Sequence, residues 1–254
     1  MNRWFMLLLM LCLAPGIAGA ESRVMQILGA IDTNYRIKRD IKADVLITQQ
    51  KVDQGTKVID MQYFRRDADD SFLIAMRAPE NEKGNGYLRV GDNFWMYRKN
   101  TRTFQHINRD ESIGGSDAKG GDFETRKLTE LYGPALDANG KEILREEMLG
   151  QVPVYRLEIT AQVNDVDYPR KIYWVRRDSN LLLKEESYSL SGTHMMTAYY
   201  LKFTTIDGRY IPVKHVYIDE FEKGNKSIVD IANIDTADIP DSIFTKAYLE
   251  NLSK

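Results

Sequence analysis

Apolar and polar residues alternate with a period of two along most of this chain, which is typical of strands with one buried face. In the clearest run, from Ser71 to Ile107, turn sequences separate three short apolar stretches. The stretches are 72–76, 87–90 and 94–97, and the turns hold Pro79-Glu80-Asn81, Gly84-Asn85-Gly86 and Gly91-Asp92-Asn93. Gly, Asn and Asp tolerate the positive φ of tight turns, so the run predicts an antiparallel meander. We expect the rest of the chain to be organised around it.

Similar alternation extends on both sides of this run. It predicts strands over 40–52, 56–66, 143–148, 154–163, 170–177, 181–190, 194–205, 210–219 and 227–234. Turn signals recur about every 8–12 residues, which favours a sandwich, a barrel or a large curled sheet. Apolar residues occupy both faces of the strand at 56–66, with Val58 and Phe64 opposite Ile59 and Met61. A curved sheet with a covered inner face would need apolar residues on both strand faces. The alternative is an ordinary sheet core filled by side chains. Pro212 predicts a sheet edge or a bulge.

Three segments have helical patterns. Over 21–34, the apolar residues Val24, Ile27, Leu28 and Ile31 share one helix face, and Ser22 is suited to the N-cap. A second helix is predicted over 123–132, with Asp122 at its start, and a short one over 241–252. The predicted fold class is therefore mostly β, of the α+β type, with a curled antiparallel sheet and a few helices.

The first twenty residues predict a secretory signal peptide. Arg3 precedes an apolar run over 4–13, which is followed by Pro15-Gly16 and by the small residues Ala18-Gly19-Ala20. An uncleaved membrane anchor is the alternative, but the run is short for a bilayer span. The chain's single cysteine, Cys12, lies within this segment, so we expect residues 21–254 to form one domain without a disulfide.

A glycine-rich loop covers 109–122, where apolar residues are few. Loops of this length inside domains are often lids or binding segments, although a tolerated insertion is an equal alternative. The residues predicted to form a lid are Gly114, Gly115, Ser116 and Asp117.

The net charge and the titratable residues indicate which functions the sequence does not favour. The chain has 35 basic and 37 acidic residues, and removing Arg3 with the leader leaves a net charge of −3, which does not favour nucleic-acid binding. His106, His194 and His215 have no metal-ligand spacing. The acid pairs Glu146-Glu147 and Glu185-Glu186 point to opposite strand faces, and we interpret them as solvated edges. We predict a protein that is not an enzyme and has no cofactor.

Several motifs resemble the LolA-like outer-membrane lipoprotein-sorting proteins. They are Met76-Arg77-Ala78-Pro79, Lys83-Gly84, Tyr87-Leu88-Arg89, Asp92-Asn93, Trp95-Met96-Tyr97, Gly115-Ser116-Asp117, Asp122-Phe123, Tyr173-Trp174-Val175 and Ile211-Pro212. The order of elements matches as well, from a signal peptide and an N-terminal helix to the final meander. The resemblance spans nearly all of residues 21–254 and is nearest to an uncharacterised branch of the family.

The resemblance implies an unclosed β-barrel in the bacterial periplasm, covered by helices, with an apolar cavity for lipid or lipoprotein acyl chains. The cavity residues that it suggests are Phe72, Ile74, Met76, Leu88, Trp95, Tyr97, Tyr173 and Met196. It also implies transport towards the outer membrane, from an inner-membrane transporter to an outer-membrane acceptor. The alternative is a non-catalytic interaction module of an envelope transport complex, with the same fold and a filled interior.

Overall fold

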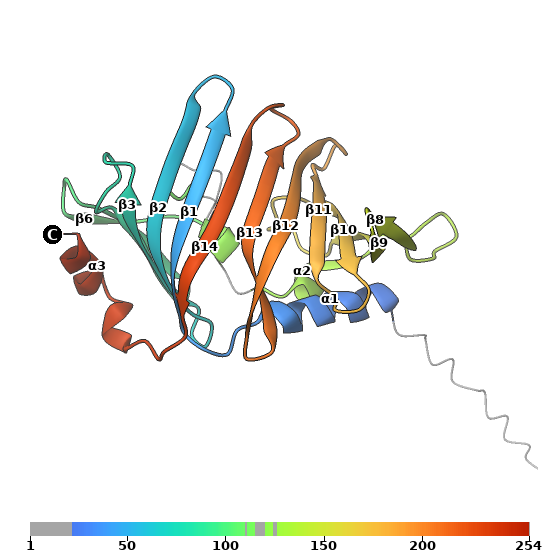
Figure 1. Cartoon of the computed structure of the whole chain (residues 1–254), viewed down its shortest axis with the longest axis horizontal. Coiled ribbons are helices and arrows are strands. Elements are labelled where there is room, and N and C mark those ends of the chain that lie inside the picture. Colours follow the sequence, from blue (N-terminus) through green and yellow to red (C-terminus); the bar gives the residue numbers. More distant parts are fainter. Residues whose placement is uncertain (1–21, 110, 115–119, 124–125, 254) are drawn as a thin grey trace, which may run out of the picture.

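A computed structural model describes residues 22–109, 111–114, 120–123 and 126–253 (Figure 1). The predicted signal peptide, residues 1–20, lies outside the described residues. So do Gly115, Ser116 and Asp117 of the predicted lid.

The described strands form one antiparallel sheet in the order β6-β5-β4-β3-β2-β1-β14-β13-β12-β11-β10-β9-β7, with β8 also paired to β9. Their bounds are β1 Ile41–Lys51, β2 Gly55–Arg66, β3 Ser71–Ala78, β4 Gly86–Val90, β5 Asn93–Arg98, β6 Thr103–His106, β7 Tyr132–Pro134, β8 Leu144–Leu149, β9 Val152–Ala161, β10 Arg170–Arg176, β11 Leu182–Tyr188, β12 His194–Ile206, β13 Arg209–Asp219 and β14 Lys226–Asp235. Within the described residues, β6 and β7 do not pair with each other, so the sheet curls without closing into a barrel. This confirms the predicted fold class.

Two meanders make up the sheet, and a single ladder joins them. Strands β1 to β6 follow one another on one side, strands β7 to β14 lie on the other, and β1 pairs with β14 between them. In this ladder Val45 faces Ile231 and Ile47 faces Val229. The first strand of the chain, β1, and the last, β14, therefore lie side by side in the middle of the sheet (Figure 1).

Helix α1, Arg23–Tyr35, confirms the predicted N-terminal helix. The Ser22 hydroxyl accepts a hydrogen bond from the Met25 N–H at 3.0 Å, as expected of an N-cap. The four predicted apolar residues of the helix are all buried. They pack against β9, β10 and β11, so this helix covers one end of one sheet face. We call that face the inner face.

The outer face has its own cover. Helix α3, Lys246–Leu252, and the 3-10 turn η2, Asp241–Ile243, follow the last strand. Leu249 of α3 and Phe244 pack onto Phe64 of β2 and Leu73 of β3. The apolar residues on both faces of β2 are thereby explained, because each face is covered near this strand.

One sequence-based expectation needs correction, and the bulge alternative at Pro212 is confirmed. The helix predicted over 123–132 is only the 3-10 turn η1, Gly120–Phe123, and the one-turn helix α2, Leu128–Leu131. The N-terminus of α2 is capped from α1, because the Asp32 carboxylate accepts hydrogen bonds from the N–H groups of Leu128 and Thr129 at 2.7 and 3.1 Å. Pro212 does not lie on an edge strand, but the β12–β13 pairing is irregular opposite it, as the bulge alternative predicts.

Candidate functional site

Two apolar clusters occupy the ends of the inner face. The α1 cluster joins the buried side of α1 to Tyr132, Leu157, Ile159, Tyr173, Val175 and Leu182. The Ile113 cluster comprises Val45, Ile47, Ile59, Met61, Phe72, Ile74, Met76, Tyr87, Phe94, Met96, Ile107 and Ile113. Both clusters are built from alternate residues of successive strands, so they result directly from the period-two pattern.

Residues 111–114 lie over the second cluster and are held there by polar contacts. The Gly114 N–H donates to the Tyr87 hydroxyl at 2.8 Å, and the Lys57 ammonium donates to the Gly114 carbonyl at 2.8 Å. The Ile113 side chain is fully buried in the cluster on the sheet below this segment. Gly114 has a φ of 59°, a conformation that favours glycine. Gly114 is the one residue of the predicted lid within the described part of the chain, and it lies over the inner face.

Between the two clusters, the inner face is only half covered. On β12, β13 and β14 this face carries six half-buried residues, which we call the central band, and the buried Ala198, Val213 and Ser227. The residues of the central band are Met196, Tyr200, His215, Tyr217, Val229 and Ile231. Tyr200 faces His215, His215 faces Val229, and Val229 faces Ile47 in the strand register. This row links the α1 cluster, against which Tyr200 packs, to the Ile113 cluster. The central band is the candidate binding surface.

His215 is the titratable group at the middle of the band. Its Nε2 lies 3.0 Å from the Pro212 carbonyl and its Nδ1 lies 3.2 Å from the Tyr217 hydroxyl. The ring packs on Tyr200 with centroids 5.2 Å apart. Burial lowers the pKa of His215, which favours the neutral imidazole. The band is therefore uncharged at neutral pH.

A buried ion pair borders the band on the side of the α1 cluster. The Lys171 ammonium on β10 lies 2.6 Å from the Glu185 carboxylate on β11. The Ser187 hydroxyl donates to this carboxylate at 2.9 Å, and the Tyr200 hydroxyl donates to it at 3.4 Å. Burial opposes the charged form of Lys171, but Glu185 raises the pKa of the lysine well above its usual value. Burial, with Glu185 next, also raises the pKa of Tyr200.

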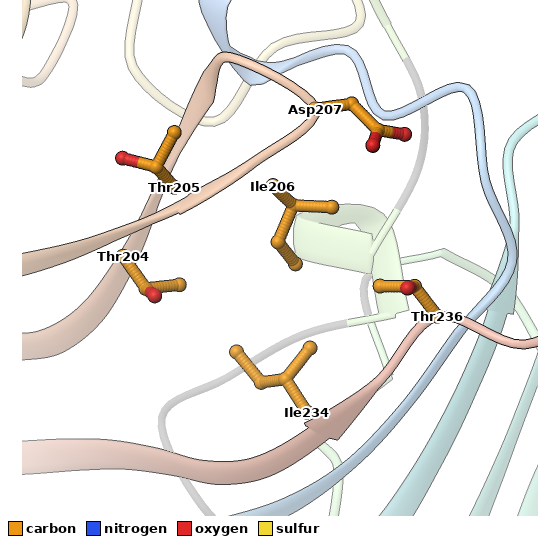
Figure 2. Close-up of a pocket in the computed structure, with 6 residues that line it drawn as sticks. All are labelled: Thr204, Thr205, Ile206, Asp207, Ile234 and Thr236. Atoms are coloured by element: carbon orange, nitrogen blue, oxygen red, sulfur yellow. The ribbon is translucent and has the colours of Figure 1, made fainter.

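Two surface pockets lie away from the central band. One, of about 370 Å³, lies at the β12–β13 turn, where Ile206 and Ile234 are surrounded by Thr204, Thr205, Asp207 and Thr236 (Figure 2). The other, of about 280 Å³, is lined by Arg176, Asp178, Ser179, Leu181 and Tyr210. Polar groups outweigh apolar ones in the first lining and equal them in the second, so neither is the mostly apolar pocket that an acyl chain would fill.

The structure separates the eight residues predicted for the cavity. Phe72, Ile74 and Met76 lie in the Ile113 cluster, Tyr173 lies under α1, and Met196 belongs to the central band. The other three, Leu88, Trp95 and Tyr97, lie on the outer face below α3. Successive side chains of a strand point to opposite faces, and the prediction grouped these residues without applying that alternation to β4 and β5.

Sequence reasoning missed Lys171 and Glu185, and it misread the second acid pair. Glu185 and Glu186 do point to opposite faces, but β11 is an interior strand and Glu185 is only 5% exposed. Lys184 lies 2.6 Å from Glu186 on the outer face. The sequence did contain a signal for this ion pair. Lys171 is two residues from the apolar Tyr173 and so points to the same strand face, and a charge on a buried face needs a partner.

Across the described residues, no group of three or more His, Cys, Asp or Glu side chains is placed to hold a metal ion. In the same part of the chain, no helix combines the length and the apolar character that a membrane span requires.

Comparisons with solved structures identify the fold. A LolA superfamily protein from Nitrosomonas europaea has a TM-score of 0.71 and 24% identity, covering 88% of this chain and 97% of that one. A domain assigned to the outer membrane lipoprotein-sorting proteins of Vibrio parahaemolyticus has a TM-score of 0.75 and 14% identity, covering 89% and 97%. A DUF1329 family protein from Desulfovibrio piger has a TM-score of 0.75 and 18% identity, with the same coverage. The protein has the LolA-like fold.

The family assignment follows from the sequence. A family model described as "-like: Uncharacterized protein" matches residues 68–251, so the chain belongs to that family. A comparison with curated proteins found no match.

Proposed function

We propose that this protein is a periplasmic carrier that binds lipid or lipoprotein acyl chains on the central band of its inner face. It would receive them from an inner-membrane transporter and release them to an outer-membrane acceptor. The proposal gives the protein no catalytic role, and binding would not need a cofactor. The predicted signal peptide and the LolA-like fold support the location.

The observation on which the proposal depends is the half-covered central band. It combines aromatic and aliphatic side chains with His215 at its middle, between two filled clusters on a sheet that does not close around it. Each methylene group removed from water stabilises a bound chain by about 0.8 kcal/mol, so a surface that contacts many methylenes needs few polar contacts. The neutral His215 and the paired Lys171 add no net charge at the band.

The experiment uses neighbouring residues of β14 that point to opposite faces. Delipidated protein is incubated with bacterial membrane lipid extract, purified again and analysed by mass spectrometry for acyl-chain ligands. Val229→Glu places a charge on the central band, whereas Ile228→Glu places the same charge on the outer face, and both parent residues are half-buried. We expect the wild type and Ile228→Glu to retain ligand and Val229→Glu to lose it. A wild type that retains no acyl chains contradicts the proposal.

One observation favours the alternative, a non-catalytic interaction module. Ile113 is fully buried in its cluster, so that end of the inner face is filled by the protein's own side chains. A module with a filled interior would retain no lipid in the same experiment, and Val229→Glu would then resemble Ile228→Glu. The two functions are thus separated by one measurement.

A further inference from the structure

Three hairpin tips end side by side along one rim of the sheet. The hairpins β1–β2, β13–β14 and β11–β12 are successive in the sheet order, and their tips all lie at the end opposite α1 (Figure 1). Strands lie about 4.8 Å apart, so neighbouring tips are roughly 10 Å apart. We call the tip segments 52–54, 189–193 and 220–224 the tip rim.

Each tip presents one large apolar side chain to solvent. Val52 is 69% exposed, Leu190 is 91% exposed and Phe221 is 65% exposed. Isolated exposed apolar residues are ordinary on protein surfaces. Turn tips are normally polar, however, and three successive tips that each present an apolar side chain form a row.

Polar side chains fix the tips in place and leave these apolar side chains outside. The Asn225 carboxamide oxygen accepts a hydrogen bond from the Val52 N–H at 3.0 Å, which joins the first tip to the second. The Glu220 N–H donates to the Met195 carbonyl at 2.9 Å, which joins the second tip to β12. The Asp219 carboxylate accepts from the N–H groups of Phe221 and Glu222 at 2.9 and 2.7 Å. The row is thus preorganised.

The shape and charge of the tip rim indicate its partner. Three separate side chains cannot bury the roughly 1,000 Å² that a stable protein interface needs, but they can enter a deformable lipid surface. The charges of the rim and its flanks are those of Lys51 and Lys223 against Asp53, Asp219, Glu220 and Glu222, a net charge of −2. This does not attract an anionic surface.

We propose that the tip rim docks the protein reversibly on a zwitterionic lipid surface, by insertion of Val52, Leu190 and Phe221. This interaction goes beyond acyl-chain binding and does not depend on it. It would set the orientation of the molecule on a membrane, with the tips towards the lipid and α1 away from it (Figure 1).

The test measures flotation of the full chain with phosphatidylcholine vesicles. The tip variant is Val52→Ser/Leu190→Ser/Phe221→Ser. The matched control is Leu136→Ser/Met148→Ser/Leu201→Ser, which removes residues that are 56%, 58% and 56% exposed elsewhere. We expect the tip variant to lose about tenfold or more in vesicle affinity and the control to lose less than about twofold. Added phosphatidylglycerol should weaken the wild type's binding.

Three results would overturn the proposal: a wild type that does not float, a tip variant that binds like the wild type, or a control that loses as much. Sedimentation equilibrium tests whether a second copy of the chain, and not lipid, binds the tip rim. In that case the wild type and the control would be dimers, the tip variant would be a monomer, and flotation would be the same for all three. Thermal unfolding should be unchanged in the tip variant, since its substituted side chains are exposed. The variant should also retain acyl chains from lipid extract, so failure of docking and failure of the carrier function are distinguishable.

Discussion

Lys171 faces Ser187 in the strand register, yet its ammonium reaches diagonally to Glu185 and lies 2.6 Å from that carboxylate. The two side chains are 16% and 7% exposed. This is a buried ion pair beside the apolar α1 cluster, with the Lys171 ammonium 5.5 Å from the centre of the Tyr132 ring. Burying two charges is unfavourable unless both are paired and hydrogen-bonded, and here Ser187 and Tyr200 supply the additional hydrogen bonds.

Loss of the lysine should therefore be costly. Lys171→Met leaves the Glu185 carboxylate buried without its cation, and we expect the free energy of unfolding to fall by about 3–5 kcal/mol. Lys171→Met/Glu185→Gln should recover most of this loss, because the amide is neutral and still accepts the hydroxyl hydrogen bonds. Urea unfolding followed by circular dichroism provides the measurement.

An exposed ion pair of the same length serves as the control. The Lys214 ammonium lies 2.6 Å from the Asp230 carboxylate, but the side chains are 40% and 44% exposed. Lys214→Met should cost less than about 1 kcal/mol. Equal losses from the two lysine variants would contradict the argument from burial.

Stability should fall in mild acid because of His215. Burial lowers the pKa of this imidazole from its usual 6.5, so the unfolded chain takes up the proton first. The contribution of His215 to stability is complete above about pH 7 and is lost as the pH falls from 6.5 towards the lowered pKa of the folded state. The wild type should thus lose more unfolding free energy between pH 7 and pH 5 than His215→Gln does. Equal losses in the two proteins would contradict this prediction.

Asp32 should couple α1 to α2. Besides the two N–H groups, its carboxylate accepts a hydrogen bond from the Thr129 hydroxyl at 2.8 Å. Asp32→Ala removes all three bonds and should lower stability by about 1–2 kcal/mol. The hydroxyl of the neighbouring Thr33 donates within α1, to the Gly29 carbonyl, so Thr33→Ala should change stability less. Amide hydrogen exchange at Thr129 should accelerate in Asp32→Ala alone, and unchanged exchange there would contradict the coupling.

Local patterns predicted the elements well, because each depends on a few adjacent residues. The four buried residues of α1 and the alternation in β1 follow from spacing alone. Pairings between distant strands leave no such signal, and neither does the choice of which face receives α3. Leu88 and Met76 look alike in sequence, yet they lie on opposite faces because the strand parity differs. Lys171 was missed for a related reason, since its partner is on another strand.

The β1–β14 ladder has a consequence for how the molecule folds. Each meander can form from neighbours in sequence, but Val45 must find Ile231 across nearly the whole chain. Closing so long a loop is entropically costly, so we expect this ladder to form late, after both meanders are in place. The central band, which lies on β12, β13 and β14, would then be joined to the Ile113 cluster only in the last step of folding, since Val229 faces Ile47 across this ladder. Until that step, the folding chain would expose the apolar faces of two separate half-sheets.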